Sequence, residues 1–145
     1  SAWLADRIGR RWTMFSFGLI GALGAVIVAF SAHWETSWII FFTGICITMA
    51  FGDGAFGILN AFGGEQFPND ARGTGLGLGY GIGAIAKIIG PLLMGAMIGS
   101  DNLKELAHPL AAVFPAFMFF AAMLVLGGFV YLLARETKGE VLEDI

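Results

Sequence analysis

Apolar residues form four long stretches along the chain, and short segments that hold almost all of the charges separate them. Each stretch is long enough to cross the ~30 Å hydrocarbon core of a bilayer, which takes a helix of about 20 residues. The pattern therefore predicts an all-α integral membrane protein with four transmembrane helices within residues 13–134. We place the helices at about 13–32, 37–63, 73–100 and 110–134.

Two charged segments flank these helices, one over residues 1–12 and the other, a tail, over residues 135–145. Together with the middle loop at residues 65–72 they hold most of the basic residues, which are Arg7, Arg10, Arg11, Arg72, Arg135 and Lys138. The two opposite loops hold only Lys104. Lysine and arginine accumulate in cytoplasmic loops, so we expect both termini and the middle loop in the cytoplasm. The predicted location is the plasma (inner) membrane, as a multi-pass protein.

The composition favours a membrane protein over a soluble enzyme or a nucleic-acid-binding protein. Charged residues make up only 13% of the chain, against about 25% in a soluble domain. A lipid bilayer is therefore the expected surrounding, and no nucleic-acid partner is expected. Cys46 is the single cysteine, and His33 and His108 are too far apart for a metal site. No nucleophile–base pair stands out, so we expect no enzyme activity, no metal and no cofactor.

Two ionisable residues lie inside apolar stretches. Asp53 is in the second predicted helix and Lys87 is in the third. A charge near the bilayer centre costs roughly 2.5–3.5 kcal/mol or more, so such residues usually face a bundle interior or a watery cavity. The two residues lie at similar depths, so an Asp53–Lys87 ion pair is geometrically possible if the helices are neighbours. Separate partners for each residue are the alternative.

Helical periodicity groups other residues with these two. On the second helix, one face is predicted to carry Cys46, Met49, Asp53 and Asn60. On the third, one face is predicted to carry Tyr80, Gly83, Lys87 and Pro91. The first and fourth helices are apolar on all sides, which favours positions facing lipid.

The third stretch is rich in glycine. Gly75, Gly79 and Gly83 follow one another at intervals of four residues, a spacing that lets a neighbouring helix approach closely in a membrane. We expect this row to pack against another helix. Gly90 and Pro91 are expected to interrupt and kink the helix, because proline removes a backbone donor.

Three charged segments resemble cytoplasmic motifs of the major facilitator superfamily. Residues 4–11 read LADRIGRR and resemble the signature G-x-L-a-D-R-x-G-R-R, with Ala2 at the usual glycine. Residues 65–68 and 72–75 read EQFP and RGTG and resemble the loop before the eleventh helix. Residues 136–139 read ETKG and resemble the P-E-T-K-G tail of sugar porters, with Arg135 at the usual proline. The chain is thus similar to helices nine to twelve of a twelve-helix transporter. Because it starts inside a charged loop without an initiator Met, we interpret it as a fragment whose N-terminal part is missing.

The resemblance implies a mechanism. In this superfamily two six-helix halves rock around a substrate site near the midplane. The tenth helix lines the central cavity, and the ninth and twelfth lie towards lipid. The cytoplasmic loops form an inner gate, whose members here would be Asp6, Arg7, Arg10, Arg11, Glu65, Arg72 and Glu136. The simpler alternative is that these charges only set the membrane topology.

The third stretch is also similar to the eleventh helix of proton symporters for aromatic and other organic acids. Those usually carry an arginine at the position of Ala84, whereas the cation here is Lys87. A buried cation favours an anionic substrate. Our hypothesis is proton-coupled uptake of a small organic acid, in which Lys87 meets the carboxylate and Asp53 takes the proton. Asn60 and Tyr80 would lie on the same pathway.

Two alternatives remain open at this stage. One is a sugar or polyol proton symporter of the same fold, which the ETKG tail favours. The sugar-porter signature of the tenth helix, Gly-Pro followed by Trp, is absent, since residues 52–57 read GDGAFG. The other alternative is a four-helix membrane protein with a structural role and no transport activity, held together by its glycine rows.

Overall fold

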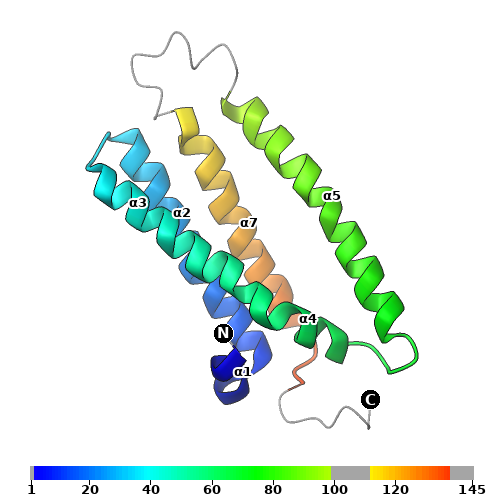
Figure 1. Ribbon diagram of the computed structural model, residues 1–145. Coiled ribbons are helices and arrows are strands. Elements are labelled where there is room, and N and C mark those ends of the chain that lie inside the picture. The colour runs from blue at the N-terminus through cyan, green and yellow to red at the C-terminus, as the bar shows by residue number, and fades with distance from the viewer. Residues whose placement is uncertain (1, 99–111, 138–145) are drawn as a thin grey trace.

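The computed structural model describes residues 2–98 and 112–137, and within these ranges the chain is helical (Figure 1). The predicted loop that holds Lys104 and His108, and the tail beyond Thr137, lie outside the described residues. The elements, in chain order, are α1 (Ala2–Ile8), α2 (Arg10–His33), α3 (Trp38–Ile47), the π-helical turn η1 (Thr48–Gly52), the 3-10 turn η2 (Asp53–Ala55), α4 (Phe56–Glu65), α5 (Arg72–Ile98) and α7 (Phe114–Leu133).

Four helical units in the described ranges are long and apolar enough to cross a membrane. They run over Arg10–His33, Trp38–Glu65, Arg72–Ile98 and Phe114–Leu133. The predicted all-α fold with four transmembrane helices is therefore confirmed. The second unit is continuous from α3 through η1 and η2 to α4, so the two short turns lie inside a membrane-spanning segment.

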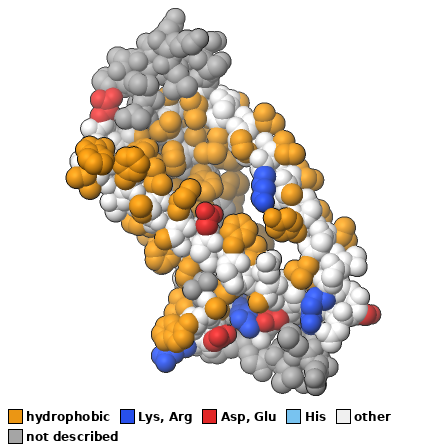
Figure 2. Space-filling view, viewed as in Figure 1, with side chains coloured by type: hydrophobic (Ala, Val, Ile, Leu, Met, Phe, Trp, Pro, Cys, Tyr) orange, Lys and Arg blue, Asp and Glu red, His pale blue; other side chains and the backbone are white. Residues whose placement is uncertain are grey.

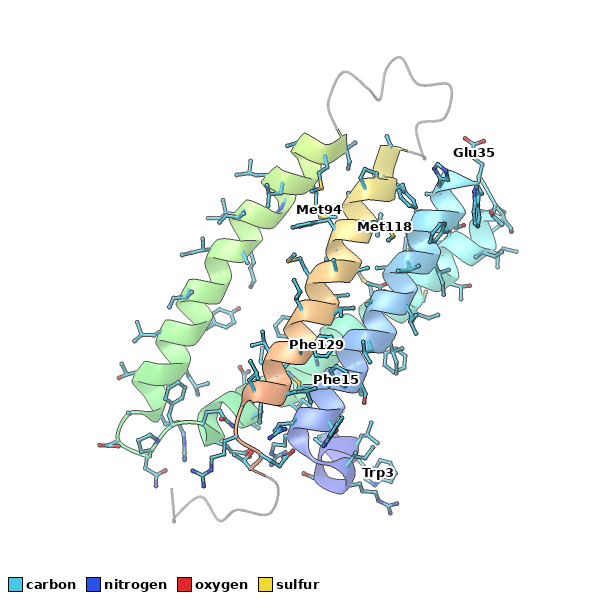
Figure 3. The ribbon with its side chains drawn as sticks, turned by 180° about the vertical axis from the view of Figure 1, so that it is seen from behind. Trp3, Phe15, Glu35, Met94, Met118 and Phe129 are labelled. Atoms are coloured by element: carbon cyan, nitrogen blue, oxygen red, sulfur yellow. The ribbon has the colours of Figure 1, made fainter. Side chains whose placement is uncertain are left out.

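Helix α2 is the centre of the packed part of the molecule. Half of its apolar segment is buried, because α3 and η1 cover one side and α7 covers another. Met14 and Val28 are fully enclosed. Figure 3 shows Phe15 and Phe129 pointing toward one another across the α2–α7 contact, with ring centroids 5.3 Å apart. The expectation that this first helix faces lipid therefore fails for the half of its surface that packs against other helices. The other half is open, with Trp12 and Leu23 exposed.

Close packing of α2 depends on small residues. A Cβ placed on Gly24 would lie 2.6 Å from the Thr48 hydroxyl oxygen and 2.8 Å from the Gly44 carbonyl oxygen. A Cβ on Gly21 would lie 3.1 Å from the backbone nitrogen of Gly52. Here two helix backbones approach each other directly, as small residues permit in membrane bundles.

The second span changes its helical winding at this contact. The Thr48 hydroxyl donates to the Gly44 carbonyl at 2.9 Å, and it also lies 3.4 Å from the Gly21 carbonyl of α2. A π-turn follows at once, and a 3-10 turn follows the π-turn. Gly52 and Gly54 lie in these turns and have low helix propensity. A π-turn holds more residues per turn than an α-helix and a 3-10 turn holds fewer. The two turns therefore rotate the faces of α4 relative to α3.

Helix α5 stands apart from α2. In both views α7 lies between α2 and α5 (Figures 1 and 3). Contacts with α4 and the connecting loop hold the start of α5: the Phe67 ring lies where a Cβ on Gly75 would be, and Leu76 reaches Gly63. None of the residues of α5 is buried. The helix continues through Pro91 to Ile98, so the predicted interruption at Gly90–Pro91 does not occur. Membrane helices tolerate proline in this way when neighbouring groups satisfy the freed backbone atoms.

Candidate functional site

The larger hollow of the described structure is a groove between α4 and α5. It has a volume of about 720 Å³, within the usual range of small-molecule sites. Asn60 lines it from α4, Tyr80 and Lys87 line it from α5, and Tyr131 closes it from α7. Figure 2 shows most basic side chains of this face at one end of the molecule, and one basic side chain apart from them beside a hollow. Three of the four predicted pathway residues, Asn60, Tyr80 and Lys87, thus share one groove.

Lys87 and Tyr80 contact each other within this groove. The Lys87 ammonium donates a hydrogen bond to the Tyr80 hydroxyl, with 3.1 Å between Nζ and Oη. The same nitrogen lies 5.0 Å from the centre of the Tyr80 ring, within the range of a cation–π interaction. Side chains of a helix lean toward its N-terminus, so the lysine stem points back to the turn that carries Tyr80. The predicted shared face of Tyr80, Gly83 and Lys87 is seen in the groove lining.

Asp53 lies in a second hollow, of about 360 Å³, between α2, the turns of the second span and α7. Met49 lines this hollow with it, whereas Asn60 opens to the larger groove. Asp53 and Asn60 thus open to different hollows, contrary to the predicted shared face, and the 3-10 turn at Asp53–Ala55 changes the helical register between them. Among the described residues no ion pair joins Asp53 to Lys87.

The two hollows are adjacent. Both have Phe56, Leu59 and Tyr131 in their linings. These three side chains therefore form the partition between the carboxylate of Asp53 and the ammonium of Lys87. The two opposite charges thus lie in adjacent hollows and are not paired with each other.

A charged cluster lies where α1, α2, α4 and the segment after α7 meet. Arg10 is at its centre: its Nε lies 2.6 Å from a carboxylate oxygen of Glu65, and its Nη1 lies 3.5 Å from one of Asp6. Glu65 is largely enclosed, with only 11% of its side chain exposed. The Thr137 hydroxyl donates a hydrogen bond to the same Glu65 oxygen that Arg10 contacts.

Glu136 binds the first turn of α2 from the far end of the chain. Its carboxylate accepts from the backbone N–H of Arg10 at 2.9 Å and from that of Arg11 at 3.3 Å. These N–H groups have no partner inside the helix, and the helix dipole favours an anion at this end. Gly9 precedes them with φ 108° and ψ 153°, a conformation that is almost exclusive to glycine. A Cβ at Gly9 would lie 2.8 Å from a carboxylate oxygen of Glu136.

The remaining predicted gate residues have other contacts. Arg72 donates from Nε to the Gly64 carbonyl at 2.8 Å, and so ties the start of α5 to the end of α4. The Arg7 guanidinium lies 4.5 Å from the centre of the Trp3 ring. Arg11 takes part through its backbone N–H. All these residues lie at the same end of the bundle, where a coordinated change is possible.

Sequence reasoning did not identify three contributors to this cluster, two polar side chains and one glycine. Thr137 bonds to Glu65, and Gln66 exchanges two hydrogen bonds with the backbone of Arg135, at 2.9 and 3.2 Å. Gly9 supplies the backbone geometry. The signals were present in part, since Gln66 and Thr137 lie within the EQFP and ETKG segments. Nothing in the chain order indicates that these two segments meet.

Comparison with known proteins covers the whole chain. Residues 1–144 match the model of the Major Facilitator Superfamily. The chain is 31% identical over its full length to the niacin transporter NiaP of Acinetobacter baylyi, and 29% identical over 99% of its length to a putative niacin/nicotinamide transporter NiaP of Bacillus subtilis. It is 30% identical over 79% of its length to a benzoate transport protein of A. baylyi.

The chain spans only part of these relatives: 30%, 33% and 23% of their respective lengths. No solved structure matches it significantly. The family match extends over nearly every residue, and the four membrane-spanning helices and the charged end of the bundle fit it. The chain belongs to the Major Facilitator Superfamily.

Proposed function

We propose that this chain forms part of a secondary transporter that moves a small organic acid by proton-coupled alternating access. The observation that carries the proposal is the position of Lys87 in the groove between α4 and α5. Among the described residues that line this groove, Lys87 is the one cation and none is a carboxylate. Such a lining attracts an anion by Coulomb's law, and the attraction is stronger where water is excluded.

The relatives support this substrate class. Two are named for niacin and one for benzoate, and both compounds are aromatic carboxylic acids. The groove also offers aromatic side chains, from Phe56, Phe67 and Tyr131. An aromatic carboxylate thus has both an ionic and an apolar match in the same space.

Asp53 is our candidate for the carrier of the coupling proton. It lies in the adjacent hollow, separated from the groove by Phe56, Leu59 and Tyr131. An ionisable residue within a membrane span is most often part of an ion or proton pathway. Its position at the junction of a π-turn and a 3-10 turn also supports a functional role, since π-turns occur often at functional sites.

The charged cluster around Arg10 is our candidate for the inner gate. Its contacts join α1, α2, α4 and the segment after α7. The Asp6 side chain is 71% exposed, so its pair with Arg10 contributes only about 0–1 kcal/mol and is easily released. The Arg10–Glu65 pair is largely enclosed, and we propose that it holds the closed state. We propose that this end faces the cytoplasm, in the plasma (inner) membrane, because its loops hold most of the arginines.

The test uses the full-length protein in proteoliposomes, with uptake of labelled nicotinate and benzoate driven by an inward pH gradient. Removing a charge-assisted hydrogen bond costs about 1.5–3 kcal/mol, so Lys87→Ala is expected to reduce uptake at least tenfold. Asp53→Asn is expected to abolish stimulation by the pH gradient while exchange between labelled and unlabelled acid continues.

Cys46→Ser serves as the control, because Cys46 is exposed and lines neither hollow. Unchanged pH-driven uptake in both Lys87→Ala and Asp53→Asn contradicts the proposal. Competition by glucose or a polyol, with no competition by carboxylates, would instead assign the sugar-porter alternative.

A further inference from the structure

We infer that Tyr80 positions the Lys87 ammonium and makes the groove select aromatic carboxylates over aliphatic ones of equal charge. The inference rests on the proposed function, since it concerns the same groove, but it assigns a separate role to a separate residue. Its basis is the contact between the two side chains and the arrangement of the groove walls around them.

Within the groove, Tyr80 holds the ammonium of Lys87 in place. Lys87 and Tyr80 are two helical turns apart on the same face of α5, and both are exposed to the groove. The lysine stem is flexible and its ammonium has three donors. The Tyr80 hydroxyl, at 3.1 Å, and the Tyr80 ring, at 5.0 Å, hold that ammonium against α5. Both contacts also offset part of the cost of a cation within the membrane span.

The groove has open space beside Tyr80 and Lys87. Gly79 and Gly83 also line the groove, and a Cβ on either residue would meet no atom within 4 Å. The helix surface next to Tyr80 and Lys87 is therefore bare. Phe56 and Tyr131 face it from α4 and α7. A planar ring placed here has the Tyr80 ring on one side and these aromatic side chains on the others.

When a substrate binds, the Lys87 ammonium exchanges the Tyr80 hydroxyl for the substrate carboxylate. A carboxylate that enters the groove accepts from the Lys87 ammonium, and the charge-assisted bond is stronger than the bond to the neutral Tyr80 hydroxyl. The hydroxyl is then free to donate to the second carboxylate oxygen. The ring of the substrate packs on the Tyr80 ring, in the offset or edge-to-face geometry that aromatic pairs prefer. A carboxylate with an aliphatic ring makes the ionic contact with Lys87 but not the aromatic contact with the Tyr80 ring.

The experiment compares benzoate with cyclohexanecarboxylate, which have the same charge and the same non-hydrogen atoms. The full-length protein in proteoliposomes is assayed for apparent KM and maximal uptake rate with each acid. In the wild type we expect a lower KM for benzoate. Tyr80→Leu is expected to raise the KM for benzoate about three- to tenfold and to leave that for cyclohexanecarboxylate within about twofold.

Tyr80→Phe keeps the ring and removes the hydroxyl. We expect it to retain the preference for benzoate and to raise both KM values by a similar, smaller factor, because Lys87 loses a positioning partner. It also serves as the second variant if Tyr80→Leu does not fold, and monodispersity in detergent is the check of folding.

The outcomes separate this inference from the proposed function. If Lys87→Ala abolishes uptake of both acids while Tyr80→Leu leaves the ratio of their KM values unchanged, the proposed function stands and the role of Tyr80 is overturned. If neither acid is taken up or competes with uptake in the wild type, both are overturned. A collapse of the benzoate preference in Tyr80→Leu but not in Tyr80→Phe confirms the inference.

Discussion

Two helices of this chain are rich in glycine and use it in opposite ways. On α2, Gly21 and Gly24 lie against the backbone of the second span, so that a Cβ at either position would be 3.1 Å or less from another atom. On α5, a Cβ at Gly79, Gly81 or Gly83 would meet no atom within 4 Å. The spacing on α5 is the more regular of the two, yet the close packing in the described residues is on α2.

The difference shows that a row of glycines gives a helix surface without side chains. Whether that surface packs against a helix or lines a groove depends on what lies opposite it. Where another backbone lies opposite, the bare surface permits close packing. Where a groove lies opposite, it leaves space for a molecule. The charges follow the same division: Arg10 and Glu65 are paired within the packed end, whereas Lys87 faces the groove with a neutral partner.

The strongest test of this comparison is Gly24→Leu. The new side chain would meet Thr48 and the Gly44 carbonyl at distances that no rotamer relieves, because two of the nearest atoms belong to backbone. Overpacking of this kind costs roughly 1–3 kcal/mol and occasionally more, and we expect about 3 kcal/mol here. Thermal unfolding of the full-length protein in detergent measures it. Gly95→Leu on α5 is the matched control, because a Cβ there meets nothing within 4 Å.

The next largest effect is expected from Gly9→Ala. Its φ of 108° is unfavourable for any residue with a Cβ, at about 1–3 kcal/mol, and the Cβ would also press on Glu136. We expect a loss of about 2 kcal/mol in the same unfolding assay. The double variant Gly9→Ala with Glu136→Ala removes the steric part and keeps the backbone strain, and its reference is the single variant Glu136→Ala, which also lacks the cap. Equal stability of the double variant and that single variant would show that the strain contributes nothing.

A smaller effect is expected from Glu136→Gln. Arg10 and Arg11 donate to different oxygens of the carboxylate, so the single amide oxygen can keep only one of these bonds, and the interaction of a negative charge with the helix N-terminus is lost. We expect a destabilisation of about 1 kcal/mol or less, reduced further at high salt. Asp70→Asn, an exposed acid in the loop before α5, is the control for the loss of one negative charge. Equal effects of the two substitutions would argue against a capping role.

The smallest change in stability is expected from Gly81→Ala. Gly81 faces open space and does not line the groove, and alanine is the better helix former by up to about 1 kcal/mol. We expect unchanged or slightly higher thermal stability and unchanged uptake kinetics. A clear destabilisation would mean that helices outside this chain pack on the α5 glycines in the full-length protein, and the contrast with α2 would then hold only for the chain itself.

Hydrophobic patterning was sufficient to predict the fold class, since four apolar spans require four helices in a bilayer. The shared face of Tyr80, Gly83 and Lys87 was also predictable, because α5 keeps a regular α-helical period around these residues. The position of Asp53 relative to Asn60 was not predictable from a 3.6-residue period. The 3-10 turn at Asp53–Ala55 lies between them, and the apolar pattern of the span does not indicate that turn.

The packing of the helices was predicted less well. An apolar helix surface looks the same in sequence whether lipid or protein covers it, so α2 was expected to face lipid, whereas half of its apolar segment is buried against other helices. The charged residues of the three motifs that resemble the superfamily were identified by that resemblance. Their pairing, in which Glu136 binds the first turn of α2 and Thr137 joins Glu65, required the three-dimensional arrangement.

The Glu136 cap has a consequence for the biosynthesis of the protein. Glu136 lies 126 residues after Arg10, so the ribosome has made all four spans before the cap can form. During membrane insertion the first turn of α2 must therefore rely on water or lipid headgroups for its free N–H groups. Since chains are made from the N-terminus onward, this cap can close only after α7 has been made. Its formation reports that α7 has reached its place beside α2.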